Sequence, residues 1–194
     1  MHAVSIERET AVVNQSNKVG KVTCFDLVCA NILPMKTISD DINRILELLA
    51  QAPIRLEKAT RGVQTTRLAL RTDAEPWSVS DILAHLRACS DVWGGSINTM
   101  IMQDNPTRRY VSPRSWMRKP KYAEQAFKAA LESFTQERQK LLETLAKLDA
   151  AGWARPGTFT GTSSRQRNQT VMSYSERIVN HEQPHLDQIE SLLR

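Results

Sequence analysis

This chain of 194 residues contains few cysteines. They are Cys24, Cys29 and Cys89. They form no C-x-x-C pair and no even set of disulfides, which favours a reducing compartment. No apolar run approaches the ~18 residues that a membrane-spanning helix needs. The most apolar N-terminal stretch, residues 22–33, is interrupted by Asp26 and precedes no clear cleavage site. We therefore expect a cytoplasmic protein that does not engage a membrane.

The sequence also has no credible set of strands, no internal repeat and no low-complexity tract. Hydrophobic residues make up 41%, which is ordinary for a globular protein and allows a core without disulfides. Apolar residues recur at the helical spacings of three and four in four segments. These segments are residues 39–60, 78–103, 123–149 and 170–193. The pattern predicts an all-α protein, a four-helix bundle.

Three residues mark particular points in these helices. Pro53 should bend or interrupt the first helix, because proline removes a backbone hydrogen bond. Ser78 and Asp81 form a capping-box sequence that starts the second helix. Arg138 lies on the apolar seam of the third, where it either snorkels to solvent or pairs with a buried acid. We favour snorkelling.

The connection between the second and third helices is long and basic. Residues 108–121 carry six lysines and arginines, within a net charge of +5. Arg109, Arg114 and Arg118 are candidates to hold an anionic substrate, although we favour a simple solvated loop. Nucleic-acid binding through this stretch is the less favoured alternative. A connection of this length could cross the whole bundle.

Residues 1–34 differ from the remainder of the chain, because they show no sustained hydrophobic period. Met35 then opens Met-Lys-Thr-Ile-Ser-Asp-Asp, which is typical of a helix start. We expect residues 1–34 to be a poorly ordered extension, or the product of an upstream start that the native protein does not use. Residues 35–194 are expected to form the bundle domain.

Three of the four histidines fall on the inward faces of the predicted helices. His181 and His185 are spaced i, i+4, which places their Cβ atoms about 5–6 Å apart on one face. His85 lies on the apolar stripe of the second helix, and facing helices of a bundle can bring it to the other two. Three imidazoles can hold a divalent ion and leave a fourth position open. Hydrogen-bonded core histidines are the alternative, but the coincidence of all three favours a metal.

His181-Glu182-Gln-Pro-His185 also matches H-E-x-x-H, the motif of zinc proteases. We reject that interpretation, because Pro184 would disturb the helix and no third ligand follows the motif. Glu182 is expected on a solvated face.

Neighbouring side chains could orient the imidazoles. Asp81, one turn before His85, and Gln188, three residues after His185, are the candidates. Cys89, four residues after His85, could approach the ion, although a small apolar core residue is the favoured interpretation.

Two separated motifs resemble those of the DinB family. Glu75-Pro-Trp77-Ser-Val-Ser-Asp-Ile-Leu-Ala-His85-Leu resembles its tryptophan–serine turn and first metal histidine, and His181-Glu-Gln-Pro-His185-Leu-Asp-Gln188-Ile resembles its closing helix. The match covers about residues 38–194. The resemblance implies an up-down-down-up four-helix bundle with zinc, nickel or iron on three histidines. It also implies chemistry like that of the family's thiol-dependent S-transferases and its maleylpyruvate isomerase.

The leading hypothesis is therefore a divalent-metal-dependent enzyme, a transferase that uses a low-molecular-weight thiol or a hydrolase. A non-catalytic metal- or ligand-binding bundle of the stress response is the alternative. The expected partner is a small-molecule substrate, and a homodimer is the expected assembly.

Overall fold

The computed structural model of the chain describes residues 37–73, 75–161 and 166–194. The extension expected at residues 1–34 lies outside this part. Four long helices form the predicted bundle: α1 (Ile38–Thr60), α3 (Val79–Met102), α6 (Phe127–Leu145) and α8 (Val171–Leu192). Short helices lie between them: α2 (Thr65–Leu68), α4 (Pro113–Trp116), α5 (Pro120–Ala123) and α7 (Ala150–Trp153). Within the described residues, no helix combines the length and the hydropathy that crossing a bilayer requires.

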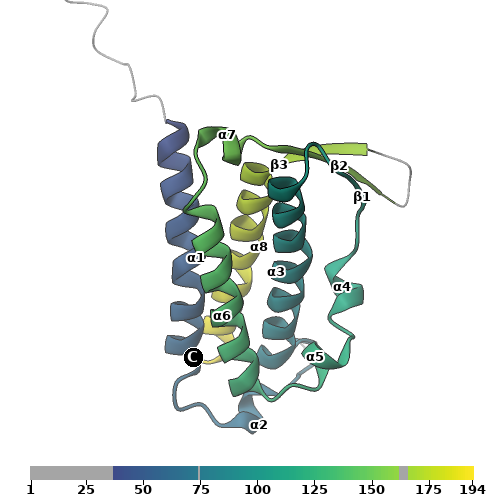
Figure 1. Cartoon of the computed structure of the whole chain (residues 1–194). Helices are drawn as coiled ribbons and strands as arrows, with labels where there is room; N and C mark the ends of the chain where they lie inside the picture. The colour runs from purple at the N-terminus through teal and green to yellow at the C-terminus, as the bar shows by residue number, and fades with distance from the viewer. Residues whose placement is uncertain (1–36, 74, 162–165) are drawn as a thin grey trace, which may run out of the picture. The chain divides into compact units, whose positions relative to one another are not determined.

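The topology is up-down-down-up, as expected (Figure 1). Helices α1 and α8 run in one direction, and α3 and α6 run in the other. Because α3 and α6 are parallel, the chain between them has to return along the length of the bundle. Figure 1 shows this crossover with α4 and α5 on its path, so the long basic connection does cross the bundle.

A three-stranded sheet lies at one end of the bundle, and the expectation of no strands was wrong (Figure 1). Strand β1 (Thr107–Arg109) pairs in parallel with β2 (Pro156–Thr160), which pairs antiparallel with β3 (Gln166–Thr170). The strands are too short to show the alternation of apolar and polar residues by which strands are predicted. Their position depends on packing against the helices. The Phe159 and Tyr174 rings lie 4.8 Å apart, and a Cβ at Gly157 would come within 2.7 Å of Met100.

The ends of the long helices follow local sequence rules. The backbone N–H of Asp81 donates to Ser78 Oγ at 3.2 Å, and that of Ser78 donates to Asp81 Oδ2 at 2.9 Å, which confirms the capping box. The two prolines depart from expectation, since α1 continues through Pro53 and α8 through Pro184. Buried apolar residues lie on both sides of each proline, so tertiary packing compensates for the lost hydrogen bond.

Besides a small cluster of Ala84, Ala88 and Tyr122, the hydrophobic core of the described residues consists of two larger clusters along the bundle. One contains Ile45, Trp93, Leu141 and Ile178 among others, and the other contains Leu56, Leu83, Phe134 and Ile189 among others. Positions 85, 138 and 182 lie where the clusters meet, so polar side chains cross the bundle at this level.

Arg138 and Glu182 form a buried ion pair at this level, which corrects two expectations. Both side chains are 1% exposed, so Glu182 is not solvated and Arg138 does not snorkel. Arg138 donates to both carboxylate oxygens of Glu182 and, at 3.0 Å, to Ser90 Oγ. The pair joins α6 to α8. In the sequence, each residue by itself was compatible with solvent exposure. Each can be buried because the other lies opposite and compensates its charge.

Candidate metal centre

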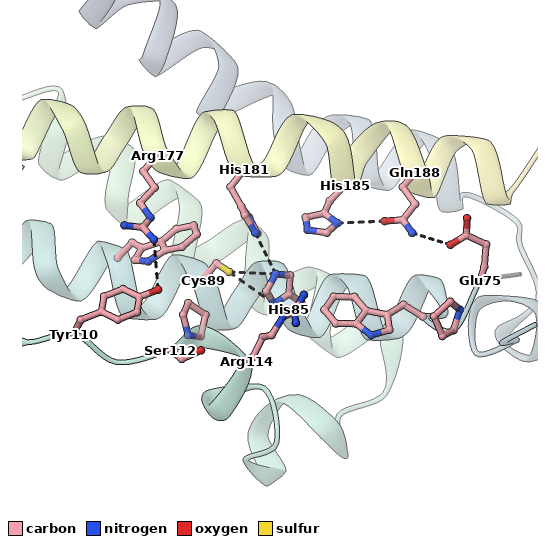
Figure 2. A pocket seen from close by; sticks show the side chains of 14 residues that line it. Glu75, His85, Cys89, Tyr110, Ser112, Arg114, Arg177, His181, His185 and Gln188 are labelled. Atoms are coloured by element: carbon pink, nitrogen blue, oxygen red, sulfur yellow. Dashed lines mark hydrogen bonds between the residues drawn. The ribbon is translucent and has the colours of Figure 1, made fainter. Parts of the chain in front are cut away.

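The structure brings the three predicted histidines together (Figure 2). His85 comes from α3, and His181 and His185 come from successive turns of α8. The centre of the His85 ring lies 5.0 Å from that of His181 and 5.2 Å from that of His185. The His181 and His185 ring centres are 4.8 Å apart. The i, i+4 spacing and the facing of α3 and α8 therefore act as the sequence suggested.

Two of the ring nitrogens have the separation expected of metal ligands. The Nε2 atoms of His85 and His181 lie 3.2 Å apart. Two nitrogens bonded at ~2.0–2.1 Å to a tetrahedral ion are about 3.3–3.4 Å apart. The separation of these two nitrogens thus fits two ligand positions on one divalent ion.

Burial keeps these rings neutral. It lowers the pKa of His85 to about 4, helped by the two other histidines and by the Arg114 guanidinium. It also lowers the pKa of His181 to about 4, helped by His185 and by the cations of Arg177 and Arg114. Near pH 7 both rings therefore present lone pairs, the form that binds a metal.

Gln188, one of the two predicted orienting residues, contacts His185. Its amide Nε2 donates to Glu75 Oε2 at 3.0 Å, which turns its Oε1 toward His185 Nδ1 at 3.3 Å (Figure 2). Because a carbonyl oxygen only accepts, Nδ1 of His185 must carry the proton. Nε2 of His185 then carries the lone pair and is the atom that can bind a metal. By contrast, Nδ1 of His181 is buried without a hydrogen-bond partner in the described residues.

Asp81, the other orienting candidate, is engaged elsewhere. Both of its carboxylate oxygens accept from Arg71 at 2.6 Å, and one also serves the Ser78 cap. The hydrogen bond from Arg71, with those from Ser78, holds the pKa of Asp81 at about 2. Asp81 thus starts the helix that carries His85.

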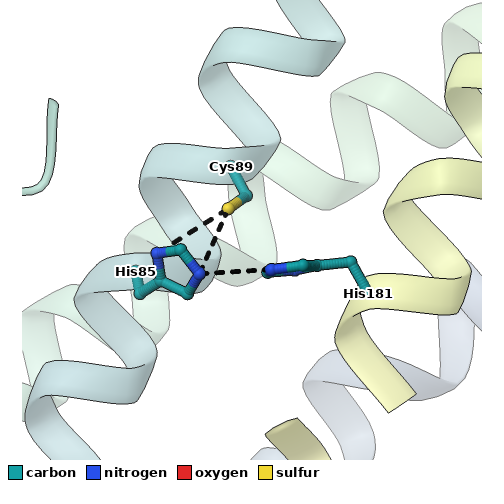
Figure 3. Close-up of side chains that lie close together, drawn as sticks. All are labelled: His85, Cys89 and His181. Carbon is teal, nitrogen blue, oxygen red and sulfur yellow. Dashed lines mark hydrogen bonds between the residues drawn. The ribbon is translucent and has the colours of Figure 1, made fainter. Parts of the chain in front are cut away.

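Cys89 lies beside the rings as well as in the core (Figure 3). Its Sγ is 3.6 Å from His85 Nε2, and the possible ligand atoms of His85, Cys89 and His181 lie within 4.8 Å of one another. Burial raises the pKa of its thiol to about 12, helped by the Glu182 carboxylate. The thiol is therefore uncharged near neutrality, and two donor sets have to be weighed: three histidines, or two with a cysteine.

The histidines line a pocket of about 520 Å³. Trp77 stacks on His185 at 6.2 Å between ring centres and meets His85 edge-on at 5.0 Å. Trp93 meets His181 edge-on at 5.0 Å. Aromatic walls beside polar rings are typical of small-molecule sites.

The comparison with protein families decides the relationship. The family model of the DinB superfamily matches residues 48–189. The chain belongs to the DinB superfamily. No curated protein matches it significantly.

Among solved structures, this DinB chain is similar to YfiT from Bacillus subtilis. The TM-score is 0.68 at 16% identity, and the match covers 84% of this chain and 93% of the YfiT chain. YfiT is described as a probable metal-dependent hydrolase with an unusual four-helix bundle topology. At this identity the likeness shows the shared fold.

The three basic candidates of the crossover occupy different places in the DinB fold. Arg114 lines the histidine pocket, with its guanidinium 5.7 Å from the Trp77 ring. Arg118 lines a neighbouring pocket of about 410 Å³ that also includes Arg114. Arg109 lies exposed on β1, away from the histidines. Sequence reasoning missed Arg177, which also lines the histidine pocket and could have been found from its i−4 spacing to His181.

Replacing Gln188 by alanine should lower the metal affinity of this DinB protein about 10–100-fold, because His185 loses the acceptor that fixes its tautomer. A competition titration against a chromophoric chelator measures the change. Gln183→Ala is the matched control. Gln183 lies on the same helix, and within the described residues its side chain is hydrogen-bonded to Arg55 alone. Equal affinities for the two variants would contradict the orienting role.

Proposed function

We propose that the protein is a divalent-metal-dependent enzyme in which His85, His181 and His185 hold one zinc, nickel or iron ion. The supporting observation is the convergence of three imidazoles from two helices on one pocket, with their ring centres within 5.2 Å. The neutral state of His85 and His181 near pH 7 supports the same conclusion.

We assign the third ligand to His185 rather than to Cys89. The Gln188 carbonyl directs the proton of His185 to Nδ1, which leaves Nε2 as a lone-pair donor. The Cys89 thiol has a pKa of about 12 and would first have to lose its proton. Three histidines also leave Cys89 within the core cluster to which its side chain belongs.

A metal held by these residues would supply Lewis acidity and would lower the pKa of a water or thiol bound to it. The chain's own groups prepare the site for this chemistry. Trp77 and Trp93 wall the rings and restrict water, which strengthens electrostatic interactions in the pocket. Arg114 and Arg177 keep the local potential positive, which favours the anionic form of a nucleophile.

Two reactions are compatible with this arrangement. The description of YfiT as a metal-dependent hydrolase favours hydrolysis, and the sequence motifs favour transfer to a low-molecular-weight thiol. The pocket of about 520 Å³ beside the rings favours an enzyme over a purely structural metal site. A homodimer and a cytoplasmic location complete the proposal.

Elemental analysis tests the metal site. We expect about one divalent ion per wild-type chain and none in His181→Ala, since the loss of one of three ligands removes most of the affinity. Chelator-treated protein reloaded with zinc, nickel or iron is then assayed for ester hydrolysis and for thiol transfer to an electrophile. Stoichiometric metal in His181→Ala would refute the site, and metal without either activity would favour the non-catalytic bundle.

A further inference from the structure

Arg177 and Arg114 are cations at the histidine pocket without an acidic partner. In the part of the chain that the structure describes, no carboxylate lies within ion-pair distance of either guanidinium. By contrast, the two buried arginines, Arg87 and Arg138, are each paired with a glutamate. Arg114 is exposed and Arg177 is half-buried, and among the described residues no carboxylate compensates the charge of either beside the pocket.

Aromatic groups fix Arg177 close to the histidines. Its guanidinium lies 4.9 Å from the centre of the Trp93 ring, and that ring meets His181 edge-on at 5.0 Å. Its Nη2 also donates to the Tyr110 hydroxyl at 3.4 Å (Figure 2). Such cation–π contacts hold the planar group in place before a ligand arrives, which lowers the entropy cost of binding.

The charge balance of the pocket calls for an anion. A divalent ion and two guanidinium groups would leave a large positive charge in the pocket. Among the described residues that line the pocket, Glu75 is the one carboxylate, and it accepts from Gln188 at 3.0 Å. A substrate that carries negative charge would compensate the rest.

We propose that Arg177 binds the carboxylate of a small substrate with a flat, apolar body. This inference rests on the proposed function and names the substrate class of the same site. The guanidinium fork and the Tyr110 hydroxyl suit the two oxygens of a carboxylate. Trp77, Trp93 and Tyr110 line the pocket and give it apolar walls for the body of the ligand, and a pocket of about 520 Å³ limits the ligand to a small molecule.

Tryptophan fluorescence of zinc-loaded full-length protein tests this subsite, because two tryptophans line the pocket. Benzoate should bind at least about tenfold tighter than its neutral analogue benzamide. A factor of this size is expected from one hydrogen bond between charged groups. Arg177→Met should abolish this preference and leave the zinc content unchanged. Arg177→Lys keeps the charge but loses the fork, so it should retain only part of the preference. Arg109→Met, an exposed arginine outside the pocket, is the control that should change nothing.

The outcomes separate this inference from the proposed function. Equal affinities for benzoate and benzamide, a full preference in both Arg177 variants, or a preference for inorganic phosphate over benzoate would each overturn the carboxylate subsite. If Arg177→Met fails to fold by circular dichroism, the lysine variant decides. A wild-type protein that selects benzoate through Arg177 but binds no zinc would keep the subsite and refute the proposed function.

Discussion

Replacing Glu182 by alanine should lower the free energy of unfolding by about 3–5 kcal/mol, because it leaves the Arg138 guanidinium buried without a counter-charge. Both side chains are 1% exposed, so water cannot replace the lost carboxylate. The remaining hydrogen bonds, to Ser90 Oγ at 3.0 Å and to the Leu49 carbonyl at 3.4 Å, satisfy donors but supply no counter-charge. Urea unfolding of chelator-treated protein measures the change without a contribution from metal binding.

Two further variants show whether burial is the cause. Glu190 lies on the same helix and pairs with Arg55 at 2.8 Å, but its side chain is 37% exposed. Glu190→Ala should therefore cost less than about 1 kcal/mol. The double variant Arg138→Met with Glu182→Leu removes both charges and should recover most of the lost stability. A Glu182→Ala protein as stable as Glu190→Ala would disprove the buried pair.

His185→Ala should lose more metal affinity than the roughly 10–100-fold expected for removing an orienting partner such as Gln188. Cys89→Ala should keep stoichiometric metal. The reason is that the hydrogen bond to Gln188 leaves Nε2 of His185 as a lone-pair donor, whereas the buried Cys89 thiol has a pKa of about 12. Elemental analysis and chelator competition on both variants measure the difference.

Cobalt substitution gives an independent test of the donor set. Cobalt bound by three imidazoles lacks the intense near-ultraviolet charge-transfer absorption that a thiolate ligand produces. The wild-type spectrum should show no such band and should be the same in Cys89→Ala. A thiolate band that disappears in Cys89→Ala would identify His85, Cys89 and His181 as the ligands and exclude the three-histidine site.

The sequence by itself determined the four long helices and the approach of the histidines. Its apolar stripes specify which face of each helix is buried, and in a bundle the buried faces meet. His181 and His185 share a face because of the helical period alone. His85 joins them because its own stripe faces the same interior. These are local regularities that the amino-acid sequence alone shows.

Tertiary structure alone decided the features that depend on a partner far away in the chain. Glu182 is buried because Arg138, 44 residues earlier, faces it, and neither residue signals this pairing by itself. The short strands form because Phe159 and Gly157 pack against side chains of the helices. Their sequences show no alternation of apolar and polar residues that would predict them. Pro53 and Pro184 stay within continuous helices for a similar reason, since packing outweighs one missing hydrogen bond.

The same division holds within the pocket. The spacing of the histidines predicts that they share a site. The proposed role of Arg177 depends on its contacts with Tyr110 from the crossover and with Trp93 from α3. Spacing is a property of one segment, whereas charge compensation is a property of the assembled core. The chain alone therefore predicts which residues share a face, and the folded structure decides which of them pair.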